Sequence, residues 1–527
     1  MRLNTVANAA VEQENQKMQT LRLILGDQVN SQHSWFQETN EQVTYCMFEM
    51  RQETDYVRHH IQKIVGFFLA MRSFAEQLEK NGHKVIYYQL DHRKNTQSLT
   101  KNLKNLIGEN SIQKFEYLLP DEYRLDEELR AFCEEIEIES EVFDTEHFYT
   151  SRNELQEFFK GKKTYLMENF YRAMRKKHDV LMNGDEPAGG KWNFDKSNQK
   201  KWKNQTLIPD PILFTKEVSH LKKLIDEAGI ETIGQLPKDQ FHFPVSRKEA
   251  LEQLDYFCEK LLIHFGDYQD AMHTDKAMLY HSGLSFAMNL KLISAREVVE
   301  RIEKYYLKHQ DEIDISQVEG FIRQVIGWRE YMRGVYWAQM PEYAQRNELE
   351  NHEKLPDFYW TGKTKMNCLS NCIQNSLRNA YAHHIQRLMI TGNFALLTFR
   401  HPDEVDDWYL GIYIDAIQWV QLPNTRGMSQ WADGGLLATK PYVSSASYIH
   451  KMSNYCDSCH YDHKQRTGEK ACPFNSLYWN FLDEKRKYFE KNPRMSMMLS
   501  LLDKISKDEL KAIKARAADI IENTDDY

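Results

Sequence analysis

The first part of the chain alternates between short apolar runs and amphipathic segments. Between the second and third runs, apolar residues from Val57 to Leu78 recur at steps of three and four, which is the helical period. Strands that alternate with helices predict a parallel sheet covered by helices, so we expect an α/β domain over residues 21–150. The apolar runs, each of strand length, lie at 21–25, 43–50, 84–90 and 115–120.

Helical periodicity dominates from residue 216 to the end of the chain. Segments 249–265, 286–306 and 321–337 each carry apolar residues along one face. We therefore expect one large all-α domain over 216–527. Residues 1–20 lack an apolar core, and we expect them to form a polar extension.

Charge is distributed unevenly between these two parts. Residues 121–146 carry 12 acidic side chains against two arginines, which is typical of a solvated helical face. Residues 152–203 carry 13 Lys and Arg against seven Asp and Glu, and Pro187 with Gly189 and Gly190 disfavours a long helix there. We expect 151–215 to be an extended basic connector, either a plain linker or a loop that contacts a phosphate backbone.

The composition narrows the class of protein. The 527 residues are 41% hydrophobic and 28% charged, a soluble globular balance that excludes wholesale disorder and contains no apolar run of about 18 residues for a membrane span. The net charge of −9 does not favour nucleic acid overall, although a local basic patch decides docking. The start carries no secretory signal, so we expect a cytoplasmic protein with reduced thiols.

The cysteines give the first specific chemical signal. Cys456, Cys459 and Cys472 lie within 17 positions, and Cys368 and Cys372 are candidates for a fourth ligand. Four thiolates commonly hold zinc or an iron–sulfur cluster. The nearby His460 and His463 would favour zinc, so the spacing alone leaves the two metals open.

Other residues have both a structural and a chemical interpretation. Asp27 follows the first predicted strand and Glu49 lies at the end of the second, where α/β folds bind ligands, although loop solvation and capping explain such residues more often. His383 and His384 are suited to proton transfer near neutral pH or to a structural role. Packing explains most of the aromatic residues, while two or three could carry electrons. The aromatic set is Trp360, Trp408, Tyr409, Trp419, Trp431, Tyr442 and Tyr448.

Several motifs together resemble one family, the iron–sulfur bacterial cryptochromes and photolyases, whose repair members are the prokaryotic (6-4) photolyases. LRLILGDQ resembles the family's opening strand, and EPAGGKWNFD resembles its interdomain loop. Flavin-domain likenesses lie at 273–294, 327–331, 380–397 and 428–435. The resemblance implies a Rossmann-like antenna domain over 21–150 and an FAD-binding catalytic domain over 216–527.

The resemblance also implies the cofactors and their ligands. It favours a [4Fe–4S] cluster over zinc, with Cys368 joining Cys456, Cys459 and Cys472, and Cys372 as a bystander. It places a 6,7-dimethyl-8-ribityllumazine antenna near Asp27 and Glu49. A turn before a helix, HSGLS, offers free N–H groups to the flavin diphosphate. The implied FAD contacts are Ser282, Leu284, Ser285, Gln324, Arg329, Arg387 and Asp415.

The implied activity is light-driven reversal of (6-4) photoproducts in UV-damaged DNA. An electron would come from photoexcited reduced FAD and a proton from His384, with His383 and Tyr442 beside the flipped lesion and Trp360, Trp408 and Tyr409 as the electron path. Leu388 stands where eukaryotic members carry a second histidine. A blue-light photoreceptor of the same fold is the alternative, and a zinc-stabilised nucleic-acid-binding protein is the alternative from another class. We expect a monomer that needs no membrane.

Overall fold

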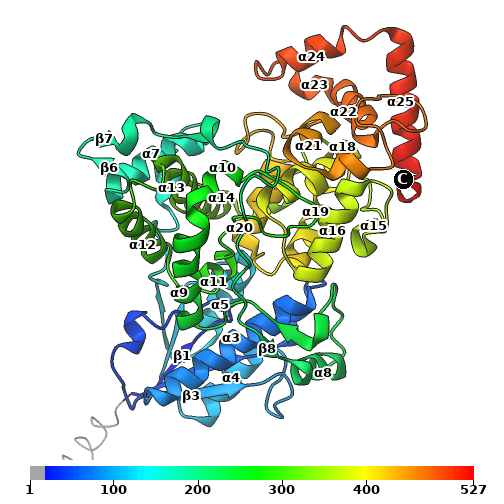
Figure 1. The fold of residues 1–527 in the computed structure, drawn as a ribbon. Helices are drawn as coiled ribbons and strands as arrows, with labels where there is room; N and C mark the ends of the chain where they lie inside the picture. The colour runs from blue at the N-terminus through cyan, green and yellow to red at the C-terminus, as the bar shows by residue number, and fades with distance from the viewer. Residues whose placement is uncertain (1–17) are drawn as a thin grey trace, which may run out of the picture.

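A computed structural model describes residues 18–527, so most of the predicted polar extension lies outside the described residues. An all-parallel sheet with strand order β3-β2-β1-β4-β5 forms the N-terminal part (Figure 1). Leu21 in the central strand pairs with Thr44 on one side and Phe115 on the other. The strands are β1 (Thr20–Leu23), β2 (Val43–Phe48), β3 (Lys84–Tyr88), β4 (Lys114–Leu118) and β5 (Glu139–Phe143).

Alternation of side chains along β2 explains how the sheet is covered. Cys46 and Phe48 join a core on one face with helices α4 (Leu99–Glu109) and α5 (Tyr123–Glu135). Tyr45 and Met47 point to the other face, where α3 (Ile61–Lys80) packs. The core beneath α3 continues without a break into the helical part, so one apolar interior joins the two parts.

Helices form the rest of the described chain, which confirms the predicted fold class. Apart from short two-stranded ladders and 3-10 turns, the elements after the sheet are α6 (Glu154–Phe158), α7 (Met167–His178), α8 (Ser219–Glu227), α9 (Arg247–Tyr256), η5 (Phe257–Leu261), α10 (Leu262–Tyr268), α11 (Ser285–Asn289), α12 (Ala295–Lys308), α13 (Ile315–Ile322), η6 (Arg323–Arg329), α14 (Glu330–Gln339), α15 (Phe358–Thr361), α16 (Asn367–Asn379), α17 (His384–Gln386), η8 (Arg387–Gly392), α18 (Asn393–Leu397), α19 (Pro402–Ile412), α20 (Gln418–Leu422), η9 (Pro423–Ser429), α21 (Ala446–Met452), η10 (Tyr455–Ser458), α22 (Pro473–Glu484), α23 (Arg486–Phe489), α24 (Ser496–Leu502) and α25 (Lys507–Glu522).

Two segments differ from the sequence prediction. The first half of the acidic stretch forms the expected helix, α5, but the second half contains β5. β5 is an edge strand whose residues are mostly exposed, so it carries no apolar signal. The expected extended connector contains α7, because Phe170, Tyr171 and Met174 give that helix a buried face. No helix among residues 18–527 has the length and hydropathy needed to cross a membrane.

Candidate active site

A cavity of about 520 Å³ lies within the helical part. Its wall comes from segments that are distant in sequence, from the start of α7 to the residues that follow η9. The structure brings all of the predicted FAD and lesion residues to this single cavity, together with Tyr409 of the predicted electron path. They are Ser282, Leu284, Ser285, Gln324, Arg329, His383, His384, Arg387, Tyr409, Asp415 and Tyr442.

Three π-helical turns, η6, η8 and η9, supply much of the cavity wall. Arg329 ends η6, Arg387 begins η8 and Ser429 ends η9. Such turns are frequent at functional sites. A Cβ at Gly392 would lie 2.1 Å from Ser429 Oγ, so the close contact between η8 and η9 requires glycine there.

The HSGLS turn fits the diphosphate expected from the family resemblance. Gly283 has a φ of +65°, and a Cβ there would lie 2.5 Å from Gln253 Nε2. Ser282 Oγ accepts a hydrogen bond of 3.3 Å from the Leu284 N–H. The backbone therefore turns tightly beside the cavity, at a position that only glycine tolerates.

Arg329 provides an unused donor on the same wall. Its guanidinium carbon lies 4.9 and 4.8 Å from the ring centroids of Phe148 and Trp419, and Nη2 donates to Met288 O at 3.3 Å. Nη1 is buried without a hydrogen-bond partner. Glu330 Oε1 lies 4.0 Å from Nη1, beyond hydrogen-bond distance, so this buried N–H can still donate to an anionic ligand.

Arg387 and Asp415 form an ion pair across the cavity. Arg387 Nη2 donates to the two Asp415 carboxylate oxygens at 2.9 and 3.2 Å, and its Nε donates to Ala382 O at 2.7 Å. The guanidinium carbon lies 3.8 Å from the Tyr413 ring centroid. The pair is held rigidly, so it can present fixed donors and acceptors to the edge of a planar ring.

The two adjacent histidines have different surroundings. His383 is buried, neither ring nitrogen has a hydrogen-bond partner, and its ring stacks on His281 with centroids 4.5 Å apart. His384 faces the open cavity. Burial lowers the pKa of His383 well below its ordinary value, and the surrounding protein with Arg387 lowers the pKa of His384 to about 4. Both imidazoles are therefore neutral at pH 7 in the free protein.

An aromatic path leads from the cavity toward the surface. The ring centroids of Tyr409, on the cavity wall, and Trp408 are 5.3 Å apart. Trp408 is 5.0 Å from Tyr359, and the next residue, Trp360, is 39% exposed. Sequence reasoning missed Tyr359, which packs against the buried Trp408 and directly precedes the exposed Trp360 in the chain.

The cysteines meet near the C-terminal helices. Cys368, Cys456, Cys459 and Cys472 line one small pocket together with His463, whereas Cys372 lies beside Tyr455, with its Sγ 3.8 Å from the hydroxyl. Among residues 18–527, no three or more His, Cys, Asp or Glu side chains have the arrangement that would hold a single metal ion. Burial raises the pKa of Cys368 well above its ordinary value, and the neighbouring thiols add to this effect.

A second cavity, of about 120 Å³, lies at the carboxyl ends of the strands in the α/β part. Asp27 lines it, with Lys63, Asp121 and Glu122. Glu49 does not line it. The Glu49 carboxylate is buried and accepts hydrogen bonds from Arg72 at 2.6 and 2.9 Å, the Tyr87 hydroxyl at 2.7 Å and the Leu90 N–H at 2.9 Å, so its acceptors are already used.

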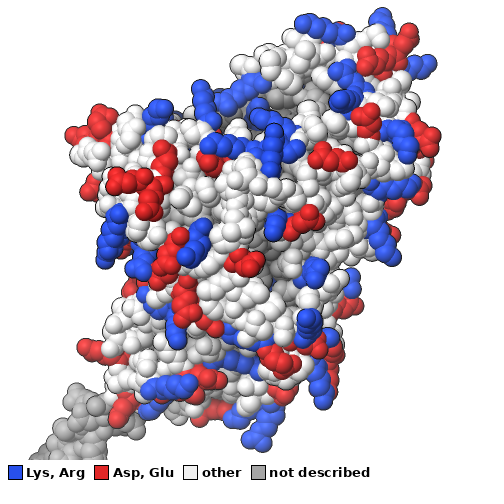
Figure 2. All heavy atoms as spheres, in the orientation of Figure 1, with Lys and Arg blue, Asp and Glu red and all other residues white. Residues whose placement is uncertain are grey.

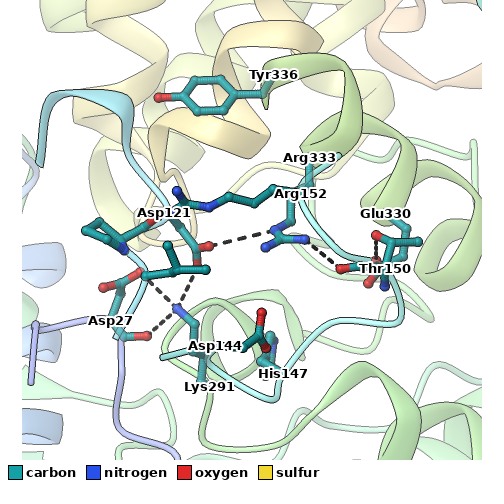
Figure 3. A network of polar contacts seen from close by, with 12 residues as sticks. Asp27, Asp121, Asp144, His147, Thr150, Arg152, Lys291, Glu330, Arg333 and Tyr336 are labelled. Atoms are coloured by element: carbon teal, nitrogen blue, oxygen red, sulfur yellow. Dashed lines mark hydrogen bonds and ion pairs between the residues drawn. The ribbon is translucent and has the colours of Figure 1, made fainter. Parts of the chain in front are cut away.

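Lys291 joins the two parts of the molecule between these cavities. Figure 3 shows its ammonium between two carboxylates, 3.0 Å from Asp27 Oδ2 and 2.7 Å from Asp121 Oδ2. Arg333 Nε lies 3.8 Å from the other Asp121 oxygen. Burial raises the pKa of Asp27. Burial acts in the same direction on Asp121, but the positive charges of Lys291 and Arg333 outweigh it, so the pKa of Asp121 is lowered. A lysine inside the apolar run NLKLI was the sequence signal for this buried charge.

Comparison with known proteins agrees with this geometry. Residues 22–241 match the family described as deoxyribodipyrimidine photo-lyase-related protein. A (6-4) photolyase of Agrobacterium fabrum is 42% identical over 514 residues, which cover 96% of this chain and 100% of that protein.

Two solved structures share the fold. A bacterial class III photolyase from Agrobacterium tumefaciens has a TM-score of 0.55 at 14% identity, covering 96% of this chain and 98% of that one. A cryptochrome from Synechocystis has a TM-score of 0.55 at 12% identity, covering 83% and 88%. These two show the fold alone, whereas the near full-length match at 42% identity shows that the chain belongs to the photolyase and cryptochrome family, in its (6-4) photolyase branch.

Proposed function

We propose that this protein is a (6-4) photolyase, which uses light to reverse (6-4) photoproducts in UV-damaged DNA. The observation that carries the proposal is the 42% identity over nearly the whole chain to a (6-4) photolyase. The cavity supports it, because the wall combines His384 and Tyr442 with the Arg387–Asp415 ion pair. A lesion must leave the base stack to enter such a cavity.

FAD is the cofactor that we propose for the 520 Å³ cavity. The HSGLS turn and Nη1 of Arg329, which makes no hydrogen bond, would hold its diphosphate, and Asp415 would face its ring edge. When bound and reduced, FAD supplies a light-driven electron to the lesion. Tyr409, Trp408 and Trp360 would return electrons to the flavin from the surface side.

His384 is the proton donor in this proposal, and His383 supports it from the buried side. Because the pKa of His384 is lowered to about 4 in the free protein, the ring has to gain its proton when DNA binds. A phosphate close to the lesion would do this, since a nearby negative charge favours the imidazolium form. Repair should therefore depend on a protonation that is coupled to DNA binding.

A ribityllumazine antenna is proposed for the cavity in the α/β part. Carboxylates of Asp27, Asp121 and Glu122 on its wall can accept hydrogen bonds from ribityl hydroxyls. Glu49 would act only indirectly, through Arg72 and Tyr87.

A [4Fe–4S] cluster held by Cys368, Cys456, Cys459 and Cys472 is proposed for the cysteine pocket. Four thiolates are the ligand set that such a cluster takes. The four cysteines line one pocket, which brings that ligand set together. Zinc uses the same ligands, so metal and sulfide analysis separates the cluster from the zinc alternative.

Basic residues beside the cavity are the proposed contacts to the DNA backbone. Figure 2 shows Lys and Arg side chains gathered in the upper middle of one face of the helical part. The basic loop 196–203 runs there, because Lys200 pairs with Asp267 of α10 at 2.8 Å and Lys201 donates to His450 O of α21 at 3.1 Å. Gln199 in the same loop lines the cavity. The local charge can thus bind phosphates despite the net charge of −9.

The experiment uses an oligonucleotide with one (6-4) photoproduct, incubated with pre-reduced protein under blue light and analysed by chromatography. Restoration of the undamaged bases in light but not in darkness supports the proposal, with a cyclobutane-dimer oligonucleotide as the lesion control. Normal flavin photoreduction without repair of either lesion would favour the photoreceptor alternative. Size-exclusion chromatography with light scattering tests the proposed monomer, and cell fractionation tests the proposed cytoplasmic location.

A further inference from the structure

A buried hydrogen-bond chain runs from the cysteine pocket to the histidine pair. The Gln386 side chain stands at its centre and is 3% exposed. Its Oε1 accepts a hydrogen bond from the backbone N–H of His383 at 3.2 Å, and its Nε2 donates to the Tyr455 hydroxyl at 3.0 Å. One amide thus contacts both sites.

Tyr455 belongs to the cysteine side of this chain. It lines the cysteine pocket, is 1% exposed, and directly precedes Cys456 in η10. Asn367, which precedes Cys368, donates from Nδ2 to Tyr455 O at 2.8 Å. The tyrosine is therefore fixed by the two segments that bring cysteines to the pocket.

Gln386 belongs to the histidine side. It ends α17, a helix of three residues that begins at His384, and its side chain satisfies the N–H of the residue before that helix. The His383 ring makes no hydrogen bond of its own. The position of the helix start thus depends on the Gln386 amide, whose other end is held by Tyr455.

We propose that Gln386 and Tyr455 are positioning residues that make the placement of His383 and His384 depend on an intact cysteine pocket. This inference rests on the proposed function, since it assigns the histidines to repair. Loss of either link leaves a buried amide group unsatisfied, which costs about as much as one buried hydrogen bond. The histidines should then occupy the productive position less often, while the flavin cavity keeps its other walls.

The test compares Tyr455→Phe, Gln386→Met and the double variant with the wild type. Tyr461→Phe is the matched control, because Tyr461 lines the same pocket but its hydroxyl lies 3.4 Å from Tyr527 O instead of Gln386. We expect each single variant to lose about fivefold to tenfold in repair quantum yield, the range for one buried hydrogen bond. Iron content, FAD content, DNA affinity and photoreduction should match the wild type.

Two further results separate coupling from a general structural defect. The repair quantum yield of the double variant should be no lower than that of the more impaired single variant, because both changes break the same hydrogen-bond chain. Hydrogen exchange of the peptide 382–388 should rise in Tyr455→Phe and Gln386→Met but not in Tyr461→Phe. Multiplicative effects in the double variant, or unchanged exchange and yield in both single variants, would overturn the link. A wild type that fails to repair would instead overturn the proposed function, and the exchange data would still judge the link.

Discussion

Replacing Lys291 with methionine should destabilise the junction between the α/β and helical parts. The substitution keeps most of the side-chain volume but removes the ammonium that contacts Asp27 and Asp121 at 3.0 and 2.7 Å. Lys291 and Asp121 are each no more than 2% exposed. Two neighbouring buried carboxylates would then repel each other without a shared counter-charge.

The expected loss can be bounded from the structure. Removing one partner of a buried ion pair typically costs about 3–5 kcal/mol. Arg333 remains 3.8 Å from Asp121, and Asp27, whose pKa is already raised by burial, can take up a proton. Both effects offset part of the loss, so we expect about 3 kcal/mol at pH 7.

Urea unfolding followed by tryptophan fluorescence measures this loss. In the variant, the folded-state pKa of Asp27 should lie further above its unfolded value. The deficit should therefore be largest above that folded pKa and shrink as the pH falls toward 4. Lys104→Met, at an exposed pair with Glu135, serves as the control and should change little.

A second variant tests the cause directly. Asp27→Asn in the Lys291→Met background removes one of the repelling carboxylates and should recover part of the lost stability. Unfolding midpoints of Lys291→Met that equal the wild type at pH 7, or a deficit that grows as the pH falls, would refute the reasoning.

Four other predictions concern the cofactors, the catalytic residues and the pH dependence. Cys456→Ala should lose iron, labile sulfide and most of the folded yield, while Cys372→Ala keeps them; one equivalent of zinc without iron would contradict the cluster. His384→Ala should lower the repair yield by about 10²–10⁴-fold with photoreduction intact, and near-normal repair would identify another acid. Trp408→Phe should slow photoreduction yet spare repair by chemically reduced protein; unchanged photoreduction would exclude this path. Burial lowers the pKa of His60 to about 4, so the free energy of unfolding should fall by about 3 kcal/mol as the pH drops from 6.5 to 4. His60→Asn keeps a helix-capping side chain and should show a smaller fall; the same pH dependence in both proteins would contradict this.

The elements with a clear apolar period were predictable from the sequence. The runs at 21–25 and 43–50 became β1 and β2, and the period after Val57 became α3, because each buries a regular set of side chains. β5 carried no such signal, since an exposed edge strand is stabilised by pairing with β4 and not by its own burial. α7 was missed because its basic charge obscured its apolar face.

The candidate site shows the same division. The motif likenesses predicted residues such as Arg329, His384 and Asp415, which the folded chain brings to one cavity. Lys291 and Gln386 act through partners more than 60 positions away in the sequence, Asp27 and Tyr455, and no local pattern predicts such pairing. Glu49 follows a strand as expected, but Arg72 and Tyr87 had already engaged its carboxylate.

Light-dependent repair of a defined lesion tests the central claim most directly. Wild-type protein, reduced and mixed with a duplex that contains one (6-4) photoproduct, is exposed to blue light while mass spectrometry follows the damaged strand. Our account predicts that the two original pyrimidines reappear in proportion to the light dose, and that His384→Ala forms them at least about a hundredfold more slowly. A wild type that photoreduces its flavin normally, binds the duplex and leaves the lesion unchanged would contradict the account.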